Sequence, residues 1–108
     1  MDEYENLSHT KWECKYHVVF TPKYRRKVLF EKLREHLGPM FRKLAEQKES
    51  RIEEGHVMLD HVHMMLSIPP KLSVSHGVGY IRGKSAIQIA RTYEGKRRND
   101  VGHHFWAR

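Results

Sequence analysis

The sequence predicts an α+β domain with the βαββαβ order of the ferredoxin-like fold, an antiparallel sheet with both helices on one face. Segments of alternating or continuous apolar residues favour strands, and two segments with apolar residues three and four apart favour helices. Their order is strand, helix, strand, strand, helix and the opening of an incomplete last strand. The 108 residues suffice for one domain, residues 1–108, with a single modest core. In this topology the first and third strands are central neighbours.

The first predicted strand covers residues 10–21, where apolar and polar side chains alternate. Successive side chains of a strand point to opposite faces, so one face is apolar and is expected to meet the core. Cys14 is the only cysteine, which excludes an internal disulfide, and its place on this face predicts a buried, inert thiol. The apolar face consists of Trp12, Cys14, Tyr16, Val18 and Phe20.

Both predicted helices carry an apolar stripe at the helical period. The first covers residues 29–48, and Pro39 is expected to kink or divide it, because proline cannot donate to the carbonyl of Glu35. The second covers residues 74–93, with Ser73 as its N-cap. The stripe of the first helix is Phe30, Leu33, Leu37, Met40, Phe41 and Leu44; that of the second is Val74, Val78, Ile81, Ser85, Ile89 and Tyr93.

Two further strands between these helices are expected to form a hairpin. The first runs from Arg51 to Leu59, with a bulge expected at Gly55. A tight turn at Leu59-Asp60 leads into the second strand, which Pro69-Pro70 ends.

The second strand of this hairpin carries the pair His61 and His63. Residues i and i+2 of a strand point the same way, so both imidazoles are expected to project from one face, and Asp60 points to the opposite face if the strand is already regular there. Two neutral imidazoles at this spacing can bind one divalent metal ion. The alternative is a pair of ordinary histidines on a half-exposed strand, because His-x-His alone is a common pattern in a histidine-rich chain.

The chain is basic, with 20 Lys+Arg against 13 Asp+Glu, a net charge of +7 and a pI near 9.7. This balance favours a polyanionic partner, and nucleic acid is the commonest one. The run Lys23, Tyr24, Arg25, Arg26 and Lys27 has the composition of a phosphate-contacting loop whose tyrosine can stack on a base; a solvated loop is the alternative. Further candidate contacts are Arg82, Lys84, Lys96, Arg97 and Arg98.

Neither a secretory signal nor an apolar run of membrane-spanning length is present in these 108 residues. Together with the single cysteine, this predicts a cytoplasmic protein without a membrane partner.

Several blocks of the chain, from Trp12 to Arg108, resemble one known family. It is that of the HUH (His-hydrophobic-His) single-strand tyrosine transposases of the insertion-sequence two-hundred type. The blocks are residues 16–27, 60–65, 67–71, 80–86 and 104–108. The resemblance implies a bacterial homodimer that performs DNA transposition, a form of DNA recombination, by cutting and rejoining a transposable element as single-stranded DNA with hairpin ends. It also implies that His61 and His63 hold Mg²⁺ or Mn²⁺, while a tyrosine attacks the scissile phosphate and forms a phosphotyrosine link.

The chain departs from the family pattern in its C-terminal part. In the family the attacking tyrosine lies on a helix after the final strand, and no tyrosine of this sequence matches that position. The chain by itself is therefore expected not to form the covalent adduct. Two other functions stay open: a non-catalytic protein that binds hairpin DNA or RNA through its basic loops, and a metal-dependent nuclease that uses water. The nuclease is less favoured, because no cluster of carboxylates accompanies the histidines.

Overall fold

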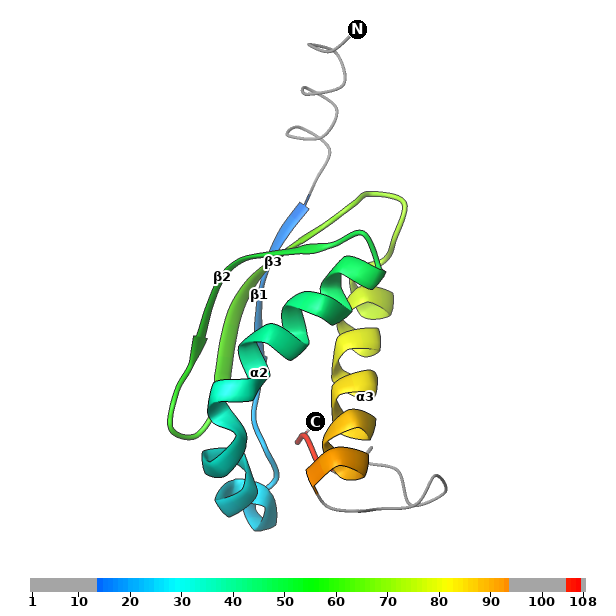
Figure 1. Cartoon of the computed structure of the whole chain (residues 1–108). Helices are drawn as coiled ribbons and strands as arrows, with labels where there is room; N and C mark the ends of the chain where they lie inside the picture. The colour runs from blue at the N-terminus through cyan, green and yellow to red at the C-terminus, as the bar shows by residue number, and fades with distance from the viewer. Residues whose placement is uncertain (1–13, 94–104, 108) are drawn as a thin grey trace, which may run out of the picture.

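The computed structural model of the chain describes residues 14–93 and 105–107. An antiparallel sheet with the order β1-β3-β2 carries both helices on one face, as Figure 1 shows. The predicted α+β class is therefore confirmed, and β3 lies in the centre beside β1, as the topology requires. The elements are β1 (Cys14–Phe20), the 3-10 turn η1 (Tyr24–Arg26), α2 (Lys27–Gln47), β2 (Arg51–Val57), β3 (Val62–Ile68) and α3 (Val74–Tyr93).

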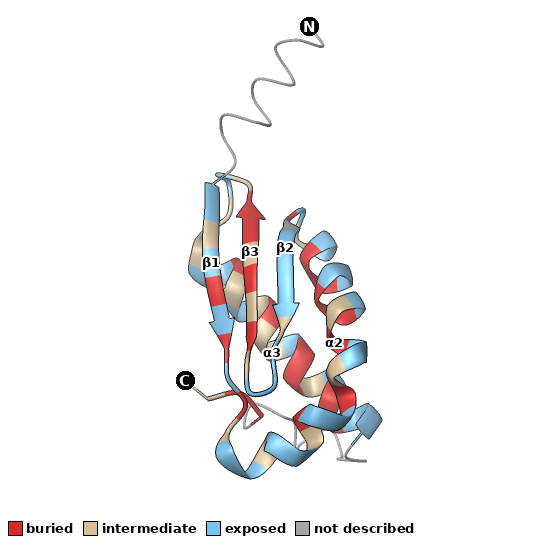
Figure 2. Ribbon diagram, turned by 90° about the vertical axis from the view of Figure 1, so that its left-hand side faces the viewer, coloured by how far each residue is buried: buried red, intermediate tan, exposed pale blue. Residues whose placement is uncertain are grey.

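The core lies between the sheet and the two helices. Alternate residues of β3 are buried against the helices, namely Val62, Met64, Leu66 and Ile68, and β1 adds Val18 and Phe20. Figure 2 looks onto the sheet and shows β3, its most buried strand, between β1 and β2. Strand β3 is hydrogen-bonded to a neighbour on both of its edges, and its buried face fixes its register against both neighbours.

Helix α2 is one continuous helix, although Pro39 lies inside it. Proline removes one backbone hydrogen bond and crowds the preceding turn, so a bend is expected there. Figure 1 shows that α2 bends along its length but is not divided. Every residue of its predicted stripe is buried: Phe30, Leu33, Leu37, Met40, Phe41 and Leu44. The second helix has the predicted bounds, and the backbone N–H of His76 donates to Ser73 Oγ at 3.1 Å, which confirms the N-cap.

The last described residues, 105–107, lie beside the end of β1. Trp106 forms a β-bridge with Pro22, Lys23 N–H donates to the Phe105 carbonyl at 2.9 Å, and Ala107 N–H donates to the Thr21 carbonyl at 2.7 Å. Phe105 and Trp106 are buried, and the Trp106 ring lies 5.3 Å from that of Phe20. The opening of the last strand therefore lies beside β1, as the predicted βαββαβ topology requires.

Three local predictions are wrong. Cys14 is exposed, because alternation assigns a residue to a face of a strand but does not say how far the helices cover that face. The bulge of β2 lies between Ile52 and Glu54, not at Gly55, and β2 ends at Val57. The bulge turns Glu53 so that its carboxylate accepts hydrogen bonds from Ser67 Oγ at 2.6 Å and from the Arg51 guanidinium at 2.9 and 3.0 Å.

Candidate metal and nucleic-acid site

The face of the sheet opposite the helices gathers histidines from all three strands. His63 of β3 pairs in register with His56 of β2 on one side and with Val19 of β1 on the other. Directly paired residues share a face, so these side chains lie on the face away from the helices. Val19 is 56% exposed, so this part of the face is open to solvent among the described residues.

His61 is not part of β3, which begins at Val62. It lies in the hairpin turn, where its carbonyl accepts a hydrogen bond from Met58 N–H at 2.8 Å. The prediction that His61 lies on the strand together with His63 is wrong, and the regular strand that would point Asp60 to the opposite face does not extend to Asp60. Asp60 Oδ1 lies 2.8 Å from His61 Nδ1, because the chain turns at this point instead of continuing as a strand.

The contact between Asp60 and His61 favours one tautomer of the imidazole. In the neutral tautomer in which Nδ1 donates to the carboxylate, Nε2 carries the lone pair that can bind a metal. Metal-binding histidines commonly donate their other nitrogen to a carboxylate in this way. The hydrogen bond from His61 is also the main cause that lowers the pKa of Asp60, and the positive charge of Lys27 adds to it.

His63 is half-buried and is held differently. Its ring stacks on that of His17 from β1, with ring centroids 5.5 Å apart and planes 26° apart. His17 was not predicted as a site residue. Only the register, in which His17 pairs with Met65, makes it a diagonal neighbour of His63.

The basic segment 23–27 joins β1 to α2 as the turn η1 and the first residue of the helix. Tyr24 is 86% exposed, and Lys27 Nζ lies 5.3 Å from the centroid of its ring. Because Phe20 at the end of β1 pairs with Val62 at the start of β3, this segment leaves the sheet beside the hairpin that carries His61. The structure therefore brings the predicted phosphate-contacting segment and the histidine hairpin to the same end of the molecule.

Arg82 and Lys84 lie on α3, on the other side of the sheet from His63. The Arg82 guanidinium donates to the Ala107 carbonyl, so it also ties α3 to the last described segment. Lys84 lies 5.8 Å from the ring centroid of Tyr80, and Lys48 lies 4.6 Å from the same centroid. Lys96, Arg97 and Arg98 lie outside the described residues.

Lys84 also lines a shallow groove between the two helices. The groove has a volume of about 260 Å³ and no acidic residue in its lining. Its walls are Leu44, Lys84, Ile87, Gln88, Arg91 and Thr92. We call it the α2/α3 groove.

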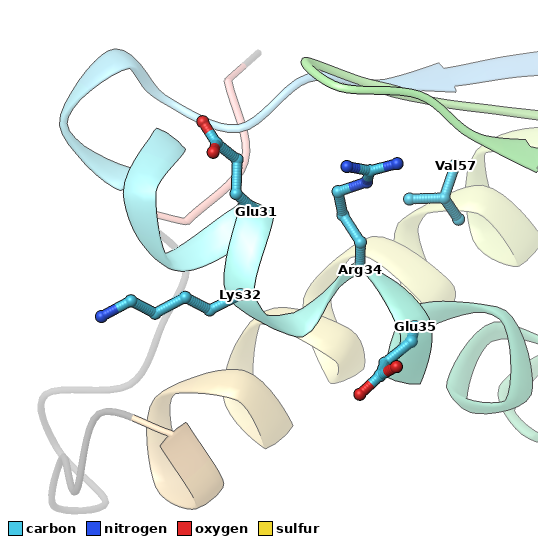
Figure 3. A pocket seen from close by; sticks show the side chains of 5 residues that line it. All are labelled: Glu31, Lys32, Arg34, Glu35 and Val57. Atoms are coloured by element: carbon cyan, nitrogen blue, oxygen red, sulfur yellow. The ribbon is translucent and has the colours of Figure 1, made fainter.

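A larger hollow of about 540 Å³ lies between the first half of α2 and the end of β2. In Figure 3 Arg34 extends toward Val57, whereas Lys32 extends the other way. Two cations and two carboxylates line it, the latter from Glu31 and Glu35, so its charge is balanced and does not favour a polyanion.

His61 and His63 are the residues near the hairpin that could hold a divalent ion. His61 Nε2 is free of described partners, His63 lies two residues away, and both rings are partly exposed. Within residues 14–93 and 105–107, no three His, Cys, Asp or Glu side chains gather as a complete metal site. Two imidazoles supply only part of the coordination of a divalent ion, so oxygen from water or substrate would have to fill its other positions. In the same residues no helix is both long and apolar enough to span a membrane.

A site of two histidines beside a cationic segment, on an α+β sheet, is typical of a protein that processes nucleic acid at a phosphate. Comparison with known proteins agrees. Residues 10–108 match the family described as "Transposase IS200 like". The chain belongs to this family of transposases, and its class of activity is DNA transposition.

Individual relatives support this assignment. The chain is 43% identical, over all of its 108 residues, to the transposase for insertion sequence element IS200 of Salmonella typhimurium, of which it covers 71%. It is 28% identical over 88% of its length to the ISDra2 transposase TnpA of Deinococcus radiodurans, of which it covers 68%. The crystal structure of a candidate transposase from Deinococcus radiodurans R1 superposes with a TM-score of 0.72 at 25% identity, over 88% of this chain and 73% of that one.

Proposed function

We propose that this chain forms the DNA-binding and metal-binding part of a transposase that binds hairpin ends of a mobile element and cleaves and rejoins single-stranded DNA, with a divalent ion held by His61 and His63, and that the 108 residues by themselves do not form the covalent DNA adduct. One observation carries this proposal. The pairing of Phe20 with Val62 places the end of β1, from which the cationic segment 23–27 follows, beside the start of β3, where His61 and His63 lie. A DNA strand that contacts the cations thereby has its backbone beside the imidazoles.

The ion proposed is Mg²⁺ or Mn²⁺. Both accept oxygen ligands in the positions that two imidazoles leave open. When bound, such an ion neutralises the charge that develops on the phosphate oxygens and orients the leaving group. Asp60 keeps Nε2 of His61 available for it.

The cationic segment would position the DNA. Lys23, Arg25, Arg26 and Lys27 can neutralise successive phosphates, and the exposed ring of Tyr24 can stack on an unpaired base. Contacts to phosphates position a strand without reading its sequence, so this segment is proposed to hold the strand and not to select it.

The nucleophile in this mechanism is a tyrosine hydroxyl, which attacks the scissile phosphate, forms a phosphotyrosine and releases a 3′-hydroxyl for rejoining. We assign this role to none of Tyr16, Tyr24, Tyr80 and Tyr93. None of these four described tyrosines makes a hydrogen bond or ring contact with His61 or His63. A homodimer is proposed as the working form, with two such sites.

A decisive test compares the variant H61A/H63A with H76A, which removes an exposed histidine of α3. The chain is titrated with Mn²⁺, followed by the electron paramagnetic resonance (EPR) of the free ion, and with a DNA hairpin carrying a single-stranded flank. We expect the double variant to lose Mn²⁺ binding by at least about 100-fold, since both ligands are removed, and H76A to bind as the wild type does. Equal Mn²⁺ affinity in all three proteins would refute the metal site.

The same samples test covalent chemistry. After incubation with the DNA and Mn²⁺, denaturing electrophoresis is expected to show no protein–DNA adduct, because the described tyrosines do not contact the histidines. An adduct band would mean that a tyrosine of this chain is the nucleophile, and peptide mapping would identify it.

The α2/α3 groove favours a second candidate function. Lys84 and Arg91 line it without an acidic neighbour in its walls, on the other side of the sheet from the histidines. A non-catalytic protein that grips hairpin DNA or RNA through such cations would bind in a salt-sensitive manner and would be unaffected by H61A/H63A. Hairpin binding that is independent of metal, with no nicking under any condition, would favour this function.

A further inference from the structure

His17 and His63 form a stacked pair across the two strands β1 and β3. Their ring centroids are 5.5 Å apart and their planes differ by 26°. The pair follows from the register, in which Val19 lies opposite His63 and Met65 lies opposite His17. Diagonal neighbours on one face of a sheet are within reach of aromatic side chains.

The two proposed metal ligands are restrained in different ways. The ring of His61 is oriented by a hydrogen bond from Nδ1 to Asp60 at 2.8 Å. His63 makes no hydrogen bond or ion pair with any residue that the structure describes, so its stack with His17 is the contact that restrains its ring.

We propose that His17 is a positioning residue that holds the imidazole of His63 in the orientation of a metal ligand. This rests on the proposed function, in which His63 binds the ion. A ring that is already oriented loses less freedom on binding, and partners of this kind tune metal affinity without touching the metal. His17 is not proposed as a third ligand, since it forms no three-residue donor group with the other described side chains.

The sheet provides a matched control. His56 lies directly opposite His63 on β2, its side chain is 61% exposed, and it makes no ring contact with His63. The variant H56A therefore removes a histidine from the same face without removing the stack. The variant H17F keeps an aromatic ring at position 17 but removes both nitrogens.

The experiment measures the Mn²⁺ affinity of the 108-residue wild type, H17A, H17F and H56A by EPR of the free ion. We expect H17A to bind roughly tenfold more weakly, as for other partners of metal ligands. H17F and H56A are expected to stay within about twofold of the wild type, because an aromatic ring can stack without nitrogens. His17 is exposed, so H17A removes no core packing, and circular dichroism verifies the fold.

A second measurement does not need the metal. Nuclear magnetic resonance of the labelled His63 ring, in the metal-free chain, should show a ring-current shift that H17A removes and H17F retains. Equal Mn²⁺ affinities for H17A and wild type would overturn the inference. An equal loss in H17F and H17A would also overturn it, because the nitrogens of His17 would then act as ligands. A wild type that binds no Mn²⁺ overturns the proposed function as well, whereas wild-type binding that H17A leaves unchanged overturns only this inference.

Discussion

Two cationic regions of this molecule differ in what accompanies the charge. At the hairpin end, segment 23–27 leaves the sheet beside the turn that carries Asp60 and His61, where we propose that a metal ion binds next to the DNA phosphate. In the α2/α3 groove, Lys84 and Arg91 lie among apolar and neutral polar residues, with no described metal donor in the lining. Both regions can attract a DNA backbone, but only the hairpin end combines attraction with groups able to assist chemistry. Positive charge alone therefore does not locate the reactive centre.

The largest effect expected from this difference is on DNA affinity. The variant R25E/K27E, which reverses both charges, should weaken hairpin binding by about 30-fold. It should also reduce the slope of log affinity against log salt concentration by roughly two, one for each lost phosphate contact. Fluorescence anisotropy at several salt concentrations measures both. K32E/K43E, on exposed positions of α2, makes the same change in net charge elsewhere. If K32E/K43E loses as much hairpin affinity as R25E/K27E, the net charge of the chain, and not the location of the charges, explains the binding.

The substitution D60N separates metal binding from DNA attraction. An amide is a weaker hydrogen-bond acceptor than a carboxylate, so the His61 ring should be less firmly oriented and its Nε2 less basic. The Mn²⁺ affinity should therefore fall about tenfold. Hairpin affinity measured without metal should not decrease, since the change removes a negative charge. E54Q, beside His56 at 3.9 Å on β2, is the matched control and should bind Mn²⁺ normally. The same affinity for D60N as for E54Q would mean that Asp60 does not orient the ligand.

A smaller effect is expected in the α2/α3 groove. For K84E/R91E we expect hairpin affinity to fall about threefold, with Mn²⁺ affinity unchanged, because long-range attraction weakens while the strand is still held at the hairpin end. The measurement is the same anisotropy titration. A loss greater than that of R25E/K27E would reverse the order of the two regions and favour a non-catalytic binding protein.

The smallest effect concerns acid stability at the other end of β3. The hydrogen bond from Ser67, followed by that from Arg51, lowers the pKa of Glu53 below its ordinary value of 4.5. A carboxylate with a lowered pKa in the folded state stabilises the fold above its unfolded-state pKa, and this contribution is lost as the pH falls through the folded-state value. Urea unfolding should therefore show a loss of stability below about pH 4.5 that is less steep in E53Q. Identical pH profiles for the two proteins would contradict this.

Much of the fold could be predicted because its signals are local. Alternation placed Val18 and Phe20 in the core, the helical stripe identified α2 and α3, and Ser73 marked a helix start that the structure confirms. The same signals failed where the outcome depends on how far the helices cover the sheet or on a local change in the direction of the chain. Cys14 has the right parity for the core but lies where the face is exposed, and Glu53 forms a bulge that no residue type announced.

The sequence by itself determined the two helices, the faces of the strands, the basic balance and the pair His61 and His63 as a candidate metal site, because residue type and spacing carry these features. Only the tertiary structure decided what surrounds that pair. The turn at Asp60 brings its carboxylate to His61, and the register of β1 against β3 brings His17 to His63. The physical reason is that contacts across strands and through a turn depend on register and chain direction, and spacing along the sequence encodes neither.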